Sequence, residues 1–126
     1  MKRILNYIPT VLAAGLIMYL SLMREPHFQL PPMPIPYIDK WMHLLMYMIL
    51  SAIMAGDILR DKAKPAMALA VAITVSAIYG GAIELLQEYC FPPRTGEWLD
   101  WAADTAGAIM GAGMIWLLTY LRKRGQ

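Results

Sequence analysis

The sequence predicts an all-α membrane protein, a single-domain bundle of four transmembrane helices that extends over residues 1–126. Hydrophobic residues make up 59% of the chain and charged residues only 16%, whereas soluble domains average about 45–50% and about 25%. The apolar residues are concentrated in four runs, each close to the roughly 20 residues that cross a bilayer as a helix. Segments rich in proline or charge separate the runs. Together, these observations favour lipid as the solvent of the fold.

The predicted spans lie at about residues 4–23, 38–59, 66–87 and 101–121. The first run follows Lys2 and Arg3 like a secretory signal, but it is long and no small-residue cleavage site follows it, so we expect a retained helix. Five prolines within residues 24–38 exclude a helix there. The charged turn 60–65 and the loop 88–100 separate the remaining spans.

Glycine pairs predict where two of the spans pack closely. Gly80 and Gly81 lie late in the third run, where they permit either a close helix contact or a kink. Gly107 and Gly111 are four residues apart in the fourth run. This small-xxx-small spacing places both glycines on one face of the helix, as in many membrane-helix contacts.

Basic residues predict the orientation of the chain. Eight of the eleven lysines and arginines fall on the side that carries both termini: Lys2, Arg3, Arg60, Lys62, Lys64, Arg122, Lys123 and Arg124. By the positive-inside rule, both termini are cytoplasmic, and the protein is a multi-pass component of the cytoplasmic (inner) membrane. The formal net charge of +2 is too small to suggest a nucleic-acid partner.

Polar residues gather at the predicted outer ends of three spans. Asp39, His43 and Tyr47 are spaced by four and share one helix face at the start of the second span. Glu84 and Gln87 share a face at the end of the third span by the same logic.

The fourth span begins with Asp100 and Asp104, and Arg94 lies in the loop before it. Charged residues inside a bilayer are costly and usually face the bundle interior or water. His43, Glu84 and Asp104 lie about one turn or more inside their spans, so we expect them to face one another.

Four of these residues are candidates for chemistry. His43 could be an interior histidine that locks two helices, a proton carrier or a metal ligand. Glu84 could pair with a cation, or act as an acid or base, because a carboxylate in a low-dielectric site tends to hold its proton. Asp39 and Asp104 would orient these two groups, although Asp39 could also serve only as a negative charge in the first helical turn.

The other polar residues are candidates for ligand binding. Lys40 and Arg94 would hold a phosphate or carboxylate, with Tyr47, Gln87 and Asp100 beside them. Each has a structural alternative. Lys40 could extend to the membrane interface, Arg94 could form an internal salt bridge, and Gln87 could form a hydrogen bond between helices.

No metal or other cofactor is predicted, and a divalent metal is kept as an alternative. His43, Glu84, Glu88, Asp100 and Asp104 could supply nitrogen and oxygen ligands to zinc or manganese. However, the chain has neither an HExxH nor a CxxC spacing. Its single cysteine, Cys90, excludes an internal disulfide.

The polar residues resemble the signature of the VanZ-like membrane proteins over about residues 37–113. The matching pieces are Asp39-Lys40-x-x-His43-x-x-x-Tyr47, Glu84-Leu85-Leu86-Gln87, Arg94 and Asp100-x-x-x-Asp104-x-x-Gly107. The family is named for an accessory protein of glycopeptide (teicoplanin) resistance. The resemblance therefore implies a site at the outer face of the cytoplasmic membrane, near cell-wall precursors, but it supplies no established reaction. Asp104 stands where the family more often has Asn.

Two functions follow as hypotheses, and the sequence leaves open whether the protein is an enzyme. In the first, the polar site binds, and could modify, an anionic membrane lipid or a lipid-linked cell-envelope precursor. In the second, the protein is a non-catalytic assembly module whose polar cluster is structural. The glycine face of the fourth span would then dock a membrane-protein partner or a second copy. A transporter is less favoured, because the inner halves of the spans offer almost no polar positions beyond Thr74 and Ser76.

Overall fold

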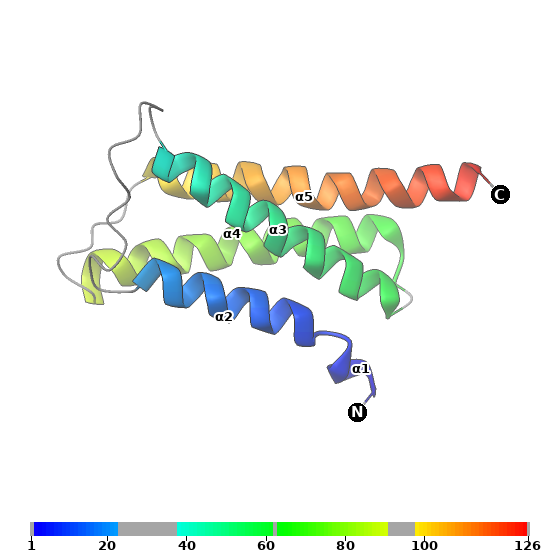
Figure 1. The fold of residues 1–126 in the computed structure, drawn as a ribbon, viewed down its shortest axis with the longest axis horizontal. Helices are drawn as coiled ribbons and strands as arrows, with labels where there is room; N and C mark the ends of the chain where they lie inside the picture. Colours follow the sequence, from blue (N-terminus) through cyan, green and yellow to red (C-terminus); the bar gives the residue numbers. More distant parts are fainter. Residues whose placement is uncertain (1, 23–37, 62, 91–97, 126) are drawn as a thin grey trace.

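The computed structural model describes residues 2–22, 38–61, 63–90 and 98–125, which form an all-α bundle. Its helices are α1 (Lys2–Leu5), α2 (Ile8–Leu22), α3 (Ile38–Arg60), α4 (Pro65–Cys90) and α5 (Trp98–Arg124). Helices α2 to α5 lie side by side and alternate in direction, so both termini lie at the same end of the bundle (Figure 1). The all-α class and the bundle of four main helices predicted from the sequence are thereby confirmed, while a fourth membrane crossing and the side of the membrane on which the termini lie stay predictions.

Three of the described helices, α3, α4 and α5, are long and apolar enough to cross a membrane. Helix α2 is apolar but has only 15 residues, which at about 1.5 Å per residue is shorter than the roughly 30 Å hydrocarbon core. The sequence predicted one helix over residues 4–23, whereas the structure interrupts it at residues 6–7. Pro9 explains the interruption, because it has no amide hydrogen to donate to the carbonyl of Leu5.

Helices α3 and α5 approach each other most closely at two glycines. A Cβ built on Gly107 would lie 2.1 Å from the carbonyl oxygen of Leu44, and one on Gly111 would lie 2.0 Å from that of Met48. Both contacts are far too short for a side chain, so the predicted glycine face is confirmed as a helix contact. This face is covered by α3, and the hypothesis that it docks a partner protein is therefore wrong.

Helix α4 presents a buried stripe of mostly small residues to the bundle. Its members recur every three or four residues: Ala68, Ala72, Ser76, Gly80, Ile83, Glu84 and Gln87. A Cβ on Gly80 would lie 2.8 Å from Oδ2 of Asp104, and α4 continues without interruption to Cys90. Of the two roles considered for Gly80 and Gly81, the structure thus supports close packing against α5.

The end of the bundle that carries the termini contains a buried carboxylate to which the sequence analysis assigned no role. Asp57 of α3 is completely buried, and its Oδ2 accepts hydrogen bonds from the Thr10 amide (3.1 Å) and hydroxyl (2.6 Å). The Arg60 guanidinium also donates to Asp57. The first amides of a helix have no partners within that helix, so Asp57 caps the first turn of α2. An acidic residue inside an apolar span, three residues before an arginine, was the available signal.

Candidate functional site

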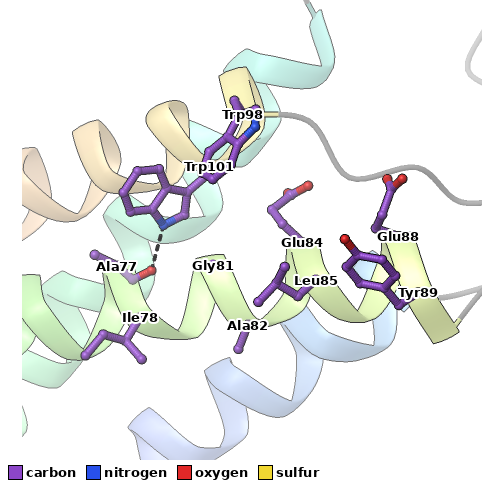
Figure 2. Close-up of a pocket in the computed structure, with 10 residues that line it drawn as sticks. All are labelled: Ala77, Ile78, Gly81, Ala82, Glu84, Leu85, Glu88, Tyr89, Trp98 and Trp101. Atoms are coloured by element: carbon purple, nitrogen blue, oxygen red, sulfur yellow. Dashed lines mark hydrogen bonds between the residues drawn. The ribbon is translucent and has the colours of Figure 1, made fainter.

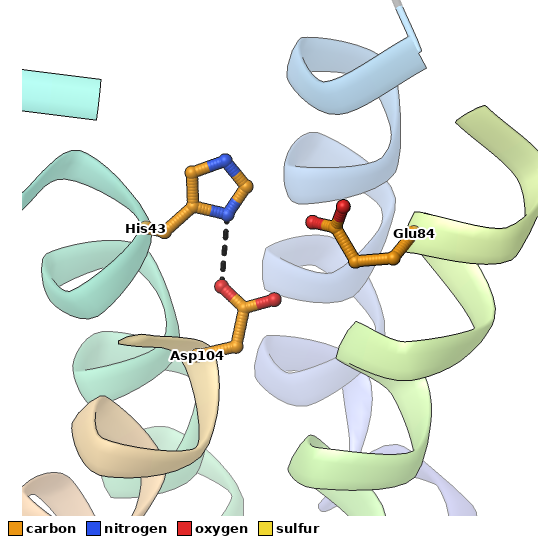
Figure 3. A group of neighbouring side chains, drawn as sticks. All are labelled: His43, Glu84 and Asp104. Carbon is orange, nitrogen blue, oxygen red and sulfur yellow. Dashed lines mark hydrogen bonds and ion pairs between the residues drawn. The ribbon is translucent and has the colours of Figure 1, made fainter. Parts of the chain in front are cut away.

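A histidine and two carboxylates from three helices meet at the opposite end of the bundle. Nδ1 of His43 in α3 lies 2.8 Å from Oδ1 of Asp104 in α5, a hydrogen bond in which the ring donates to the carboxylate. Glu84 of α4 faces this pair (Figure 3). One ligand-type atom of each of the three residues lies within 4.8 Å of the others. This arrangement agrees with the expectation from the sequence that these three side chains face one another.

A second ion pair extends the group toward the end of the bundle. Nζ of Lys40 lies 2.9 Å from Oδ1 of Asp100, and Oδ2 of Asp100 lies 3.7 Å from Nε2 of His43. Asp100 lies in the first turn of α5, where a negative charge is favoured by the helix dipole. We refer to Lys40, His43, Glu84, Asp100 and Asp104 as the polar cluster.

Carboxylates outnumber cations in the polar cluster. Glu84 is 7% exposed, Asp100 8% and Asp104 1%, so all three are largely removed from solvent. Lys40 and His43 face these three acidic groups. Buried charges must be paired or bound to a metal, and the described pairs here are Lys40 with Asp100 and His43 with Asp104.

Two other candidate binding residues, Gln87 and Tyr47, are buried in the bundle. The side-chain amide of Gln87 donates a hydrogen bond of 2.7 Å to the carbonyl oxygen of Ser21, so it ties α4 to the last turn of α2. Tyr47 is 1% exposed and its ring packs at 6.4 Å from that of Tyr79. The structure therefore supports the interhelical role of Gln87 over headgroup contact, and it places Tyr47 in the core.

Two further candidates receive no structural description. Asp39 belongs to the first turn of α3, but its side chain is not among those described. Arg94 lies outside the described residues. Their roles stay predictions from the sequence.

A groove of about 670 Å³ opens between α4 and α5 beside the polar cluster (Figure 2). Its lining is mostly apolar or aromatic and consists of Ala77, Ile78, Gly81, Ala82, Glu84, Leu85, Glu88, Tyr89, Trp98 and Trp101. Leu85, Tyr89 and Trp98 are each at least 60% exposed, so the groove is open toward the surroundings of the bundle. Glu84 belongs both to the groove and to the polar cluster.

The sequence analysis did not identify this groove. Trp101 closes one end of it, because its indole Nε1 donates a hydrogen bond of 2.9 Å to the carbonyl oxygen of Ala77 (Figure 2). A Cβ on Gly81 would lie 3.1 Å from the same indole nitrogen, so the glycine makes room for the ring. Trp98 packs edge-on against Trp101 at 6.0 Å. The only sequence signal was a pair of tryptophans three residues apart after a glycine-containing helix.

Three long apolar helices, with a polar cluster buried between their ends, define a multi-pass α-helical membrane protein. The chain belongs to the VanZ/LLP1 family, whose model matches residues 2–119. The match confirms the resemblance carried by the polar residues and extends it over α2. No curated protein and no solved structure matches the chain.

Proposed function

We propose that this VanZ-family protein binds an anionic lipid or a lipid-linked cell-envelope precursor at the outer face of the inner membrane. The observation that carries the proposal is the position of Glu84, which lines the apolar groove and also faces the polar cluster. An amphiphile requires such an arrangement, with an apolar surface for its chain next to polar groups for its headgroup.

The groove suits a hydrocarbon chain. It lies on α4 and α5, two helices long and apolar enough to span a membrane, and its exposed lining residues would face lipid. A lipid chain could therefore enter sideways from the bilayer, without crossing a polar barrier. Trp98 and Trp101, in the first turn of α5, line the groove, and amphipathic aromatic rings are common at membrane interfaces.

The polar cluster suits a headgroup and offers a route to its modification. Lys40 supplies a positive charge beside Asp100, and Arg94 of the preceding loop is expected to supply another. The imidazole of His43 is oriented by its hydrogen bond to Asp104. An imidazole held in this way by a carboxylate is suited to proton transfer, which would support modification of the bound headgroup as well as binding.

Retention of defined lipids by the purified full-length chain tests the proposal. Native mass spectrometry should show one bound phosphatidylglycerol or long-chain polyprenyl phosphate, and weaker retention of phosphatidylcholine. Ala82→Trp fills the groove from an exposed position and should abolish retention. Ala70→Trp, at another exposed alanine of α4 outside the groove, is the matched control. Equal retention of all three lipids, or normal retention by Ala82→Trp, would argue against the proposal.

A cellular test addresses the envelope. His43→Ala, Glu84→Ala and Arg94→Ala, each at unchanged protein level, should lower any teicoplanin resistance that the protein confers. Normal resistance in all three variants would be inconsistent with a functional polar site.

A non-catalytic membrane module is the second candidate function. The favouring observation is that His43 with Asp104, and Lys40 with Asp100, already form pairs within the chain. If the cluster is only structural, its variants should lower the unfolding temperature and lipid retention should be normal in those that stay folded.

A further inference from the structure

We propose that His43, Glu84 and Asp104 form a binding site for one divalent cation of the manganese or zinc type. One ligand-type atom of each residue lies within 4.8 Å of the other two (Figure 3). One imidazole nitrogen and two carboxylate oxygens form a donor set that both ions accept. Metal–ligand bonds of about 2.0–2.2 Å would require these atoms to move closer together.

The second oxygen of Asp104 is an independent indication of a ligand. Asp104 is 1% exposed, and its Oδ2 has no hydrogen-bond partner among the described residues. Figure 3 shows this oxygen directed into the space between His43 and Glu84. Leaving such a buried acceptor without a partner is unfavourable, and more so for a charged group, whereas a bound cation would satisfy it.

The histidine points one ring nitrogen at the carboxylate of Asp104. Its Nδ1 lies 2.8 Å from Oδ1 of Asp104, so a cation bound between them would take the place of the proton that the two atoms share. Gly80 keeps the space beside Asp104 open, because a Cβ there would lie 2.8 Å from Oδ2. Because residue 80 is a glycine, no side chain from this position fills the space beside the carboxylate of Asp104.

A divalent cation would also suit the ligand proposed above. The site lies beside the largely buried carboxylates of Asp100 and Asp104. A phosphate-bearing headgroup would add further negative charge at the same place. With three protein ligands, the cation keeps at least one coordination position for an oxygen of water or phosphate. The role of the cation in holding the headgroup rests on the lipid-binding function proposed above, whereas the metal site itself does not.

Manganese binding to the full-length chain in detergent, after treatment with a chelator and without added lipid, tests the inference. We expect saturable binding of one Mn²⁺ per chain, monitored by the loss of the free-ion electron paramagnetic resonance signal, and its displacement by Zn²⁺. Glu84→Gln and Asp104→Asn should each weaken binding by at least about 10- to 100-fold, the range that loss of an outer-shell partner already costs. Asp61→Asn, which removes a carboxylate at the other end of the bundle, should leave the affinity unchanged.

A measurement on the unmutated protein covers the case in which a variant does not fold. Pulsed electron paramagnetic resonance of the Mn²⁺-loaded chain should show coupling to one imidazole nitrogen. Absence of saturable binding, absence of nitrogen coupling, or equal affinity in folded Glu84→Gln and Asp104→Asn would each overturn the inference.

Lipid retention measured with and without Mn²⁺ separates the two proposals. Retention of polyprenyl phosphate without any metal binding would overturn the metal site and leave the lipid function standing. Saturable, histidine-dependent metal binding without lipid retention would support the metal site and contradict the lipid function.

Discussion

Gly107 of α5 lies directly against the backbone of Leu44 in α3, with space for only a hydrogen atom between its Cα and the Leu44 carbonyl oxygen. Leu44 follows His43 in the sequence, and Gly107 comes one turn after Asp104. This backbone contact therefore sets the register of the two helices at the level where Nδ1 of His43 meets Oδ1 of Asp104. Packing of glycine thus positions the polar cluster.

Gly107→Ala should destabilise the bundle. The added methyl would lie 2.1 Å from the Leu44 oxygen, and relief requires α3 and α5 to separate. Overpacking of this kind typically costs about 1–3 kcal/mol. We expect a lower thermal unfolding temperature in detergent, together with weaker metal binding at His43. Gly113→Ala on the same helix is the control, because a Cβ there meets nothing within 4 Å. Equal unfolding temperatures for the two variants would contradict the packing account.

Asp57→Ala should loosen α2 and leave the other helices in place. The substitution removes the acceptor of the Thr10 amide and hydroxyl, and hydrogen bonds to charged groups contribute about 1.5–3 kcal/mol each. Hydrogen exchange should accelerate at the amides of residues 8–12 more than in α4. Asp61→Asn serves as the control, because Asp61 accepts a contact of 3.4 Å from Tyr7, whereas the Thr10 amide and hydroxyl both bond to Asp57. Unchanged exchange in α2 of Asp57→Ala would show that the cap is unimportant.

Gln87→Leu should lower stability without altering ligand binding. Its amide bonds to the carbonyl oxygen of Ser21 in the last turn of α2, and the leucine side chain would leave this buried acceptor unsatisfied, at a cost of about 1–3 kcal/mol. Thermal unfolding and lipid retention, measured on the same preparation, separate the two effects. Reduced lipid retention at unchanged unfolding temperature would restore Gln87 as a headgroup contact.

The single cysteine provides a test of orientation. Cys90 is exposed at the cluster end of α4, which the positive-inside rule places outside the cytoplasm. A membrane-impermeant maleimide added to intact cells should label it. Lys123→Cys in a Cys90→Ser background places the only thiol at the other end of the bundle and should be labelled after lysis alone. The reverse pattern would invert the predicted topology.

The sequence alone determined the class of protein, the approximate extent of the long spans and the helix ends that carry the polar residues. These features depend on local properties, since the length of an apolar run and its bounding prolines and charges act whatever the neighbouring helices are. The same local reasoning placed His43, Glu84 and Asp104 at one end of the bundle. Local reasoning predicted a continuous first helix, whereas the structure breaks it at residues 6–7, just before Pro9.

Only the tertiary structure decided which partners these residues meet. It paired Lys40 with Asp100, directed Gln87 to α2, and buried Asp57 beneath the first turn of that helix. It also covered the glycine face of α5 with α3 instead of leaving it for another protein. The physical reason is that helical spacing specifies the face on which a side chain lies, whereas the helix opposite that face, and its register, depend on close packing among all the helices of the bundle.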